Sequence, residues 1–201
     1  MKITGIYLAA GKGTRMGRDK LSLPLGNHRL GMWALEKAIQ SHLDKVIVIS
    51  TQTNHSLFTS MVDNKLMISP LKNELNKQSD SIKAGLDFAI LLQSDAVIII
   101  LADQPFITSA IINQLIEVYK RDPTKLFVAA SFKGNMRPPI LISKKLFNDI
   151  YTLEGDQGAK KILMNKRHEG ILVPFFDGKI FEDIDRMDEY LYWKGIVDSM
   201  Y

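Results

Sequence analysis

The sequence predicts an α/β fold: a single Rossmann-like three-layer domain with a mainly parallel sheet and helices on both faces. First, short apolar runs alternate with stretches of helical periodicity along the chain. Second, the run over 45–50 is continuously β-branched, which is typical of a strand buried on both faces. Third, 201 residues suit one such domain, residues 1–201, with a small acceptor-side excursion around 125–160.

The first half of the chain predicts three further strands and two helices. Residues 3–9 form an apolar run that ends at a glycine-rich segment. Residues 30–41 carry apolar side chains at helical spacing with charge between them, and 78–92 repeats that pattern. The segment 65–69 is predicted to be another short strand. Residues 96–102 are the longest unbroken apolar run and therefore the clearest central strand.

In the second half, Thr108 is placed to cap a helix, and Ile107 with Ile112 would form its hydrophobic staple. A strand over 126–131 is expected to pair with a partner over 140–142, through a turn at Lys133-Gly134-Asn135. The remaining elements are a helix from Ser143 to about Tyr151, a short helix over 158–165, a strand over 171–175 and an amphipathic helix over 187–197.

Composition excludes several classes of site. The chain has no cysteine, which excludes disulfides, thiolate metal sites and a cysteine nucleophile and fits a reducing, cytoplasmic compartment. The longest apolar run has seven residues, whereas a membrane-spanning helix needs about 20, so no membrane association is expected. The net charge of +4 suits anionic ligands but is too small to indicate nucleic acid binding.

The segment after the first predicted strand is rich in glycine and basic residues. Its spacing, G-x-G-x-x-x-G over 11–17, matches neither a P-loop nor the dinucleotide fingerprint. Glycines let backbone N–H groups approach an anion closely. Arg15 can place two donors on phosphate oxygens, and Lys20 supplies a compact point charge. The loop is therefore predicted to bind phosphate.

Carboxylates follow two other segments. Asp103 ends the strongest strand, and the parallel sheet would place it beside the glycine-rich loop. There it can hold Mg²⁺ against phosphate oxygens; the alternative is an aspartate that caps the next helix or starts a turn. Asp183 and Asp185 alternate on an extended segment and would face one side. Asp185 is favoured as the second metal ligand, with a solvated acidic strand end as the alternative.

Five segments together resemble one family. L-A-A-G-K-G-T-R-M-G-R-D-K-L-S-L-P-L-G over 8–26 is similar to the signature of nucleotidyltransferases related to the molybdenum cofactor guanylyl- and cytidylyltransferases. Residues 78–86 resemble that family's S-x-x-x-G-[LI] helix start, and 101–107 its metal motif at a strand end. Residues 137–139 with 153–160 resemble its acceptor-side segment, and 183–185 its acidic motif. One departure is Arg186-Met187, where the family usually has Thr-Pro.

The resemblance implies a role for each matching residue. Arg15, Lys20 and Asp103 would be catalytic, and Asp103 with Asp185 would bind Mg²⁺. The nucleotide would contact Leu8, Ala9, Ala10, Gly11, Gly13, Thr14, Arg15, Lys20, Gln78, Ser79 and Ser81. The acceptor would contact Arg137, Pro139, Gly155, Asp156, Gly158 and Lys160.

Within the family, Leu-Ala-Ala-Gly resembles the members that use CTP, and the chain most resembles accessory factors of purine catabolism. The implied reaction transfers CMP from CTP to the terminal phosphate of molybdopterin and releases pyrophosphate, during maturation of a molybdenum hydroxylase such as xanthine dehydrogenase. The apo-hydroxylase is a further expected partner. Two alternatives stay open: a sugar phosphate or polyol phosphate as acceptor, and a non-catalytic carrier of the finished molybdopterin dinucleotide. Retention of Lys20 and Asp103 favours an enzyme.

Overall fold

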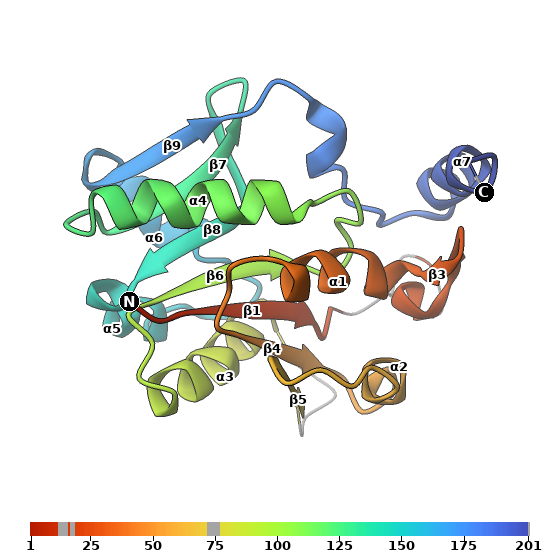
Figure 1. Cartoon of the computed structure of the whole chain (residues 1–201), viewed down its shortest axis with the longest axis horizontal. Helices are drawn as coiled ribbons and strands as arrows, with labels where there is room; N and C mark the ends of the chain where they lie inside the picture. Colours follow the sequence, from red (N-terminus) through yellow and green to blue (C-terminus); the bar gives the residue numbers. More distant parts are fainter. Residues whose placement is uncertain (12–15, 17–18, 72–76, 201) are drawn as a thin grey trace.

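The computed structural model describes residues 1–11, 16, 19–71 and 77–200. Its main sheet has seven strands in the order β5-β4-β1-β6-β8-β7-β9 (Figure 1). These strands are β1 (Ile3–Ala9), β4 (Lys45–Ser50), β5 (Leu66–Pro70), β6 (Ala96–Leu101), β7 (Phe127–Phe132), β8 (Asn135–Ser143) and β9 (Gly170–Pro174). Strand β8 is antiparallel to both of its neighbours, and the remaining pairings are parallel. The predicted α/β fold with a mainly parallel sheet is confirmed.

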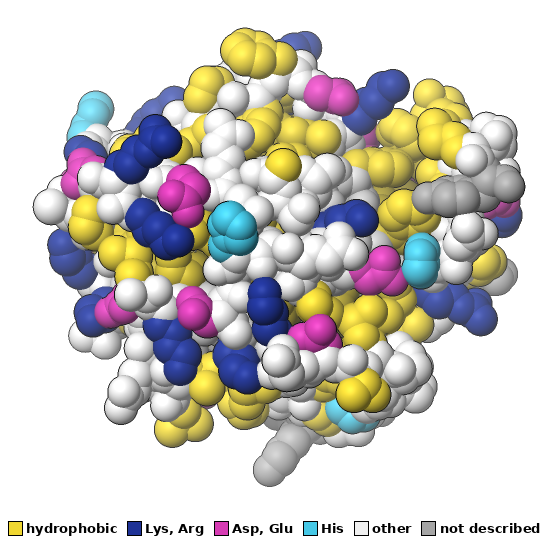
Figure 2. Space-filling model, viewed as in Figure 1, with side chains coloured by type: hydrophobic (Ala, Val, Ile, Leu, Met, Phe, Trp, Pro, Cys, Tyr) yellow, Lys and Arg dark blue, Asp and Glu magenta, His cyan; other side chains and the backbone are white. Residues whose placement is uncertain are grey.

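Helices cover both faces of this sheet. They are α1 (Trp33–Gln40), α2 (His55–Thr59), α3 (Gln78–Leu91), α4 (Ser109–Arg121), α5 (Phe147–Tyr151), α6 (Lys160–Asn165) and α7 (Met187–Asp198). One apolar cluster lies under α1 and α4, and a second lies under α3, α5 and α6. Figure 2 shows the face that α1 and α4 cover, where basic and acidic side chains are interspersed. None of the described helices is long and apolar enough to cross a lipid bilayer.

Strand alternation divides the core between the two faces. On β4, Val46 and Val48 enter the cluster under α1 and α4, whereas Ile47 and Ile49 enter the cluster under α3. All four are fully buried. Alternate side chains of β4 point to opposite faces of the sheet, and the residues on both faces are apolar. A central parallel strand requires this, because a layer of helices covers each face.

The hairpin of β7 and β8 corrects the predicted length of its second strand. Lys133 (φ 49°) and Gly134 (φ 76°) form the two-residue connection, and their positive φ values match the hairpin turns that suit twisted strands. Strand β8 begins at Asn135 rather than at 140. Pro138 and Pro139 lie where the register shifts, and a bulge tolerates residues that cannot donate to the ladder. The segment around 125–160 thus contributes two strands to the main sheet.

The C-terminal helix α7 packs against an unpredicted small ribbon of β2 (Pro24–Leu25) and β3 (His28–Arg29). The Tyr190 hydroxyl donates to Pro24 O at 2.7 Å, and Gly26 N donates to Asp198 Oδ1 at 2.9 Å. Ile184, just before this helix, is buried in a third apolar cluster together with Leu25 and Tyr190. This docking brings the segment before α7 to the carboxyl ends of the central strands (Figure 1).

Candidate active site

Strands β1 and β6 are neighbours, so the loops that follow them leave the sheet side by side. Leu8 pairs with Leu101, and Ala102 N donates to Leu8 O at 3.1 Å. Strand β4 lies on the other side of β1, which makes β1 the point where the strand order reverses. Open parallel sheets bind ligands at such a point, beyond the carboxyl ends of the strands. The predicted juxtaposition of the two loops is confirmed.

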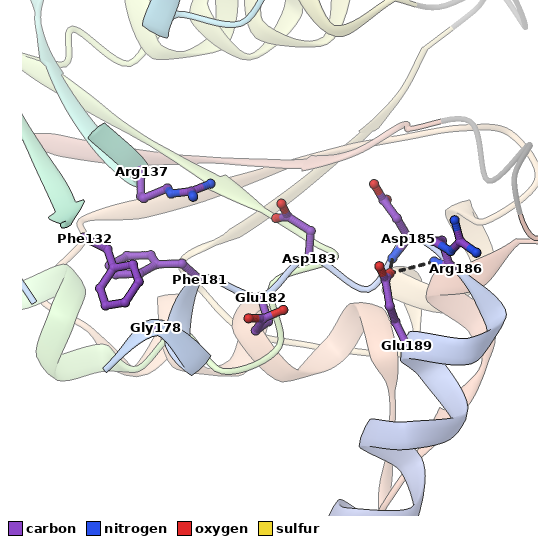
Figure 3. Close-up of a pocket in the computed structure, with 9 residues that line it drawn as sticks. All are labelled: Phe132, Arg137, Gly178, Phe181, Glu182, Asp183, Asp185, Arg186 and Glu189. Carbon is purple, nitrogen blue, oxygen red and sulfur yellow. Dashed lines mark hydrogen bonds between the residues drawn. The ribbon is translucent and has the colours of Figure 1, made fainter. Parts of the chain in front are cut away.

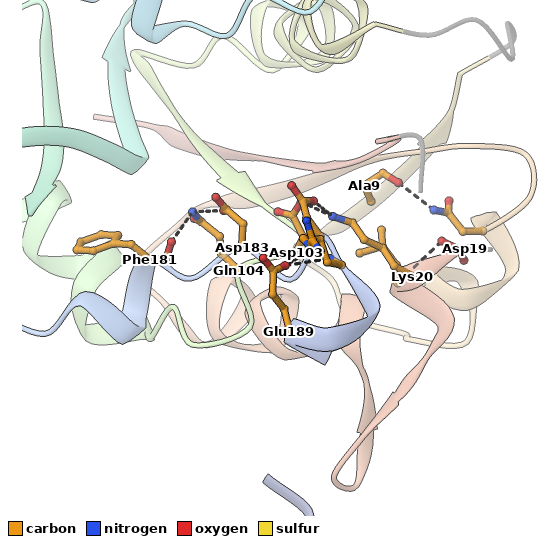
Figure 4. Close-up of polar contacts among 12 residues, drawn as sticks. Ala9, Asp19, Lys20, Asp103, Gln104, Phe181, Asp183 and Glu189 are labelled. Carbon is orange, nitrogen blue, oxygen red and sulfur yellow. Dashed lines mark hydrogen bonds and ion pairs between the residues drawn. The ribbon is translucent and has the colours of Figure 1, made fainter. Parts of the chain in front are cut away.

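Lys20 lies at the centre of this edge. It begins a 3₁₀ turn, Lys20–Ser22, that Asp19 caps by accepting from Leu21 N at 3.2 Å. Its ammonium Nζ is 2.7 Å from Asp103 Oδ2 and 2.5 Å from Asp185 Oδ1 (Figure 4). Burial by itself lowers the pKa of Lys20, but the two carboxylates outweigh it and hold that pKa above its ordinary value. Lys20 is therefore a buried, charged group between two acids.

Asp183 and Asp185 are divided between different partners. Asp185 faces Lys20, whereas Asp183 Oδ1 accepts from Gln104 Nε2 at 2.7 Å. Between them, Ile184 N donates to the backbone oxygen of Asp103 at 3.0 Å. Partial burial of its carboxyl group and the nearby charge of Asp103 raise the pKa of Asp183 to about 6. Of the two acids, Asp185 is thus the one that the structure places beside Asp103 and Lys20.

The donor set at Asp103 and Asp185 fits Mg²⁺ that is also held by a substrate. The side chains are 25% and 38% exposed, so both carboxylates reach solvent. Mg²⁺ is commonly bound by one or two carboxylates together with waters and phosphate oxygens. Among the described residues no group of three or more acidic or histidine side chains forms a complete metal cage. The arrangement therefore suits a cation that arrives with a phosphate ligand.

Further predicted nucleotide contacts lie at the end of β1 and directly after it. Leu8, Ala9 and Ala10 are buried, and Leu8 and Ala10 belong to the apolar cluster under α3. The Asn54 amide Nδ2 donates to Ala9 O at 2.9 Å, a contact that sequence reasoning missed. Gly11 is exposed, and a Cβ there would meet no described atom within 4 Å. The predicted residues Gly13, Thr14 and Arg15 lie outside the described part of the chain.

The start of α3 brings predicted nucleotide residues against predicted acceptor residues. Ser79 and Ser81 are 1% and 4% exposed, and Ser79 N donates to Gly155 O at 3.1 Å. A Cβ on Gly158 would lie 3.1 Å from Gln78 Oε1, so this loop closely approaches the helix start. Asp156 and Lys160 belong to the same loop and the helix that follows it. Gln78 and Ser79 of the first set thus lie against Gly155 and Gly158 of the second, although the two segments are far apart in the sequence.

A pocket of about 320 Å³ opens beside Asp185 (Figure 3). Arg137, from β8, and the rings of Phe132 and Phe181 lie near one another at the end of the pocket away from Asp185. Of the six predicted acceptor residues, Arg137 lines this pocket, and the other five are not part of its wall. The full lining is Phe132, Arg137, Gly178, Phe181, Glu182, Asp183, Asp185, Arg186 and Glu189.

Sequence reasoning assigned no role to Gln104 or Phe181. Gln104 follows Asp103 in the segment 101–107 that resembles the family's metal motif, and the signal that could have found it is a polar residue directly after a buried strand. In the structure Gln104 is 2% exposed and contacts Asp183. Phe181 had no signal beyond its apolar character, because its position in the pocket depends on the path of the chain after β9.

Comparison with known proteins agrees with the family resemblance. Residues 5–170 match the family model of the MobA-like NTP transferase domain, and the chain belongs to this family. It is similar to purine catabolism protein PucB of Bacillus subtilis strain 168, with 30% identity over 196 residues, which cover 94% of each chain.

Solved structures share the fold over nearly the whole chain. One is a homologue, from Mycobacterium sp. strain JC1, of the Mycobacterium tuberculosis protein Rv0371c, with a TM-score of 0.85, 24% identity and 100% of each chain covered. Another is Rv0371c of M. tuberculosis H37Rv in complex with manganese, with a TM-score of 0.80, 21% identity, and 97% and 99% of the two chains covered.

Proposed function

We propose that this protein transfers CMP from CTP to the terminal phosphate of molybdopterin and releases pyrophosphate, during maturation of a molybdenum hydroxylase such as xanthine dehydrogenase. The observation that carries the proposal is the contact of Lys20 with both Asp103 and Asp185 at the strand-order reversal. Membership of an NTP transferase family and similarity to a purine catabolism protein support it.

In this proposal an oxygen of the acceptor phosphate attacks the α-phosphorus of CTP, and the bond to the β-phosphate breaks. A phosphate monoester is largely ionised at neutral pH, so the acceptor needs no strong base. The Lys20 ammonium would balance the charge that develops on the leaving pyrophosphate, together with backbone N–H groups from Gly11 onward and with Arg15. Lys20 suits that role because it is charged before the nucleotide arrives.

Asp103 and Asp185 would hold Mg²⁺, and the manganese complex of the structurally similar Rv0371c supports a divalent cation. When bound, this cation would supply charge neutralisation on the phosphates. Lys20 must then give up at least part of its present contact with the two carboxylates. Its flexible stem allows the ammonium to turn from them to phosphate oxygens.

The proposed nucleotide site joins the end of β1 to the start of α3. Leu8-Ala9-Ala10-Gly11 would pass along the base, and Gln78, Ser79 and Ser81 would contact the base or ribose. The acceptor would use Arg137 and Pro139 on β8, with Gly155, Asp156, Gly158 and Lys160 from the loop over α3. The pocket beside Asp185 supports Arg137 as a phosphate contact, since a guanidinium can bind phosphate with two hydrogen bonds.

The test measures pyrophosphate release from each of the four NTPs with Mg²⁺, with and without molybdopterin. We expect release with CTP and molybdopterin together, and mass spectrometry should identify the cytosine dinucleotide. Release with a sugar phosphate or polyol phosphate in place of molybdopterin would reassign the acceptor. Tight binding of the finished dinucleotide, without pyrophosphate release from any NTP, would instead establish a carrier.

A further inference from the structure

Gln104 is a buried amide that the proposed chemistry does not use. It follows Asp103 directly in the loop after β6 and is 2% exposed. Its Nε2 donates to Asp183 Oδ1 at 2.7 Å and lies 3.5 Å from Phe181 O (Figure 4). Its Oε1 is also buried, and no donor among the described residues reaches it.

The surroundings determine which way this amide points. If the amide were turned over, Oε1 would face the Asp183 carboxylate and the Phe181 carbonyl, and two acceptors would repel it. The observed orientation keeps both contacts and leaves Oε1 unsatisfied, which costs free energy in a buried site. An apolar side chain of the same size would avoid that cost. The role of Gln104 therefore depends on the hydrogen bonds that its Nε2 donates, and not only on the space that its side chain fills.

What Gln104 holds is the segment that carries Asp185. Phe181 and Asp183 are its acceptors, and the next residue, Ile184, donates to Asp103 O at 3.0 Å. Residues 103 and 104 thus attach the segment before α7 at consecutive points. Asp185 comes one residue after the last of these attachments and meets Lys20.

We propose that Gln104 is a positioning residue, whose amide holds the segment 181–185 so that the carboxylate of Asp185 lies beside that of Asp103. Asp183 serves as the acceptor for this amide and does not bind the cation. The inference rests on the proposed function in one respect, that Asp103 and Asp185 form the divalent cation site. Outer hydrogen bonds that orient ligands typically change metal affinity by about 10- to 100-fold when they are removed.

The experiment measures Mn²⁺ binding by electron paramagnetic resonance, with Mn²⁺ alone and with Mn²⁺ plus CTP. Gln104→Met keeps the volume of the side chain and removes its donor. We expect it to weaken Mn²⁺ binding by about 10-fold or more. Asp183→Ala removes the acceptor of the same hydrogen bond and should cause a similar loss of Mn²⁺ affinity. Asp183→Asn retains an acceptor oxygen for Gln104 and loses only a charge near Asp103, so we expect it to keep most of the Mn²⁺ affinity that Asp183→Ala loses.

The conservative variant separates positioning from ligation. If Asp183→Asn loses as much affinity as Asp183→Ala, Asp183 is itself a ligand and the inference is wrong. Wild-type affinity in both Gln104→Met and Asp183→Ala would also overturn it. Because Asp183 is far more exposed than Gln104, Asp183→Ala remains informative if Gln104→Met fails to fold. Failure of the wild type to bind Mn²⁺ under either condition contradicts the proposed cation site itself, and is thus distinct from a failure of Gln104's role.

Discussion

The ammonium of Lys20 lies 2.7 Å from Asp103 Oδ2, although the two residues are 83 positions apart in the chain. The same ammonium also contacts Asp185, 165 positions away. One buried positive charge thus joins the loop after β1, the loop after β6 and the segment before α7. Any cation that binds the two carboxylates has to compete for them with Lys20, and replacement of Lys20 tests this competition.

Replacement of Asp103 by asparagine should lower the rate of pyrophosphate release by at least about 100-fold, since loss of a catalytic electrostatic group typically costs about 3 kcal/mol or more. The side chain keeps its shape, and Asp185 remains to pair with Lys20, so the fold should persist. Steady-state rates at saturating Mg²⁺ and CTP, with melting temperatures, provide the check. Asp63→Asn, at an exposed turn before β5, is the matched control and should keep the wild-type rate. Normal turnover of Asp103→Asn would remove Asp103 from the site.

Replacement of Lys20 by alanine should have opposite effects on two ligands. Without the ammonium, Asp103 and Asp185 lose a positive charge that competes with a cation for their oxygens, so Mn²⁺ should bind the nucleotide-free protein several-fold more tightly. CTP affinity and the rate of pyrophosphate release should fall, because a phosphate contact is lost. Electron paramagnetic resonance and calorimetry measure the two affinities. Lys120→Ala, an exposed change on α4, should alter neither. Weaker Mn²⁺ binding in Lys20→Ala would contradict the competition.

Ala10 provides a test of the proposed preference for CTP. Ala10 directly follows β1, and glycine in its place would leave more space for a purine. Steric discrimination of one methyl group is worth roughly 1–3 kcal/mol, or 10- to 200-fold in specificity. Ala10→Gly should therefore reduce the ratio of kcat/KM for CTP over GTP without reversing it, because contacts from the start of α3 remain. Since Ala10 is buried under α3, stability should also decrease slightly. A wild-type preference for GTP would show that the interpretation of Leu8-Ala9-Ala10-Gly11 is wrong.

Two helical glycines should respond in opposite directions to alanine. On α3, a Cβ at Gly85 would lie 2.3 Å from Ile6 Cγ2 and 3.1 Å from Ile6 Cγ1. Gly85→Ala must push α3 away from β1, and such overpacking typically costs about 1–3 kcal/mol in the free energy of unfolding. On α7, a Cβ at Gly195 would meet no described atom within 4 Å. Gly195→Ala should stabilise the protein by about 0.4–1 kcal/mol. Urea denaturation measures the free energy of unfolding of both variants. A Gly85→Ala variant more stable than the wild type would contradict the close packing of α3 on β1.

Features that depend on neighbours along the chain were predictable. The continuous β-branched runs of β4 and β6 define central strands, because only a strand covered on both faces buries such side chains fully. Thr108 caps α4 as expected, with its hydroxyl accepting from Ile111 N at 3.3 Å. The meeting of the loops after β1 and β6 also followed, since parallel strands end at one edge of the sheet.

Other features depend on contacts between residues far apart in the sequence. The local sequence does not distinguish Asp183 from Asp185, because both are aspartates that face the same side of an extended segment. Their partners distinguish them: Gln104 contacts Asp183, and Lys20 contacts Asp185. Likewise, Pro138 and Pro139 argue against a strand, yet the pairing of β8 with β7 accommodates them in a bulge. Arg137, directly before this bulge, lines the pocket. Periodicity and propensity report which face of an element is apolar. The tertiary structure alone determines which polar side chains become partners. The reason is that each of these hydrogen bonds joins residues far apart in the sequence, which meet only when helices and loops pack.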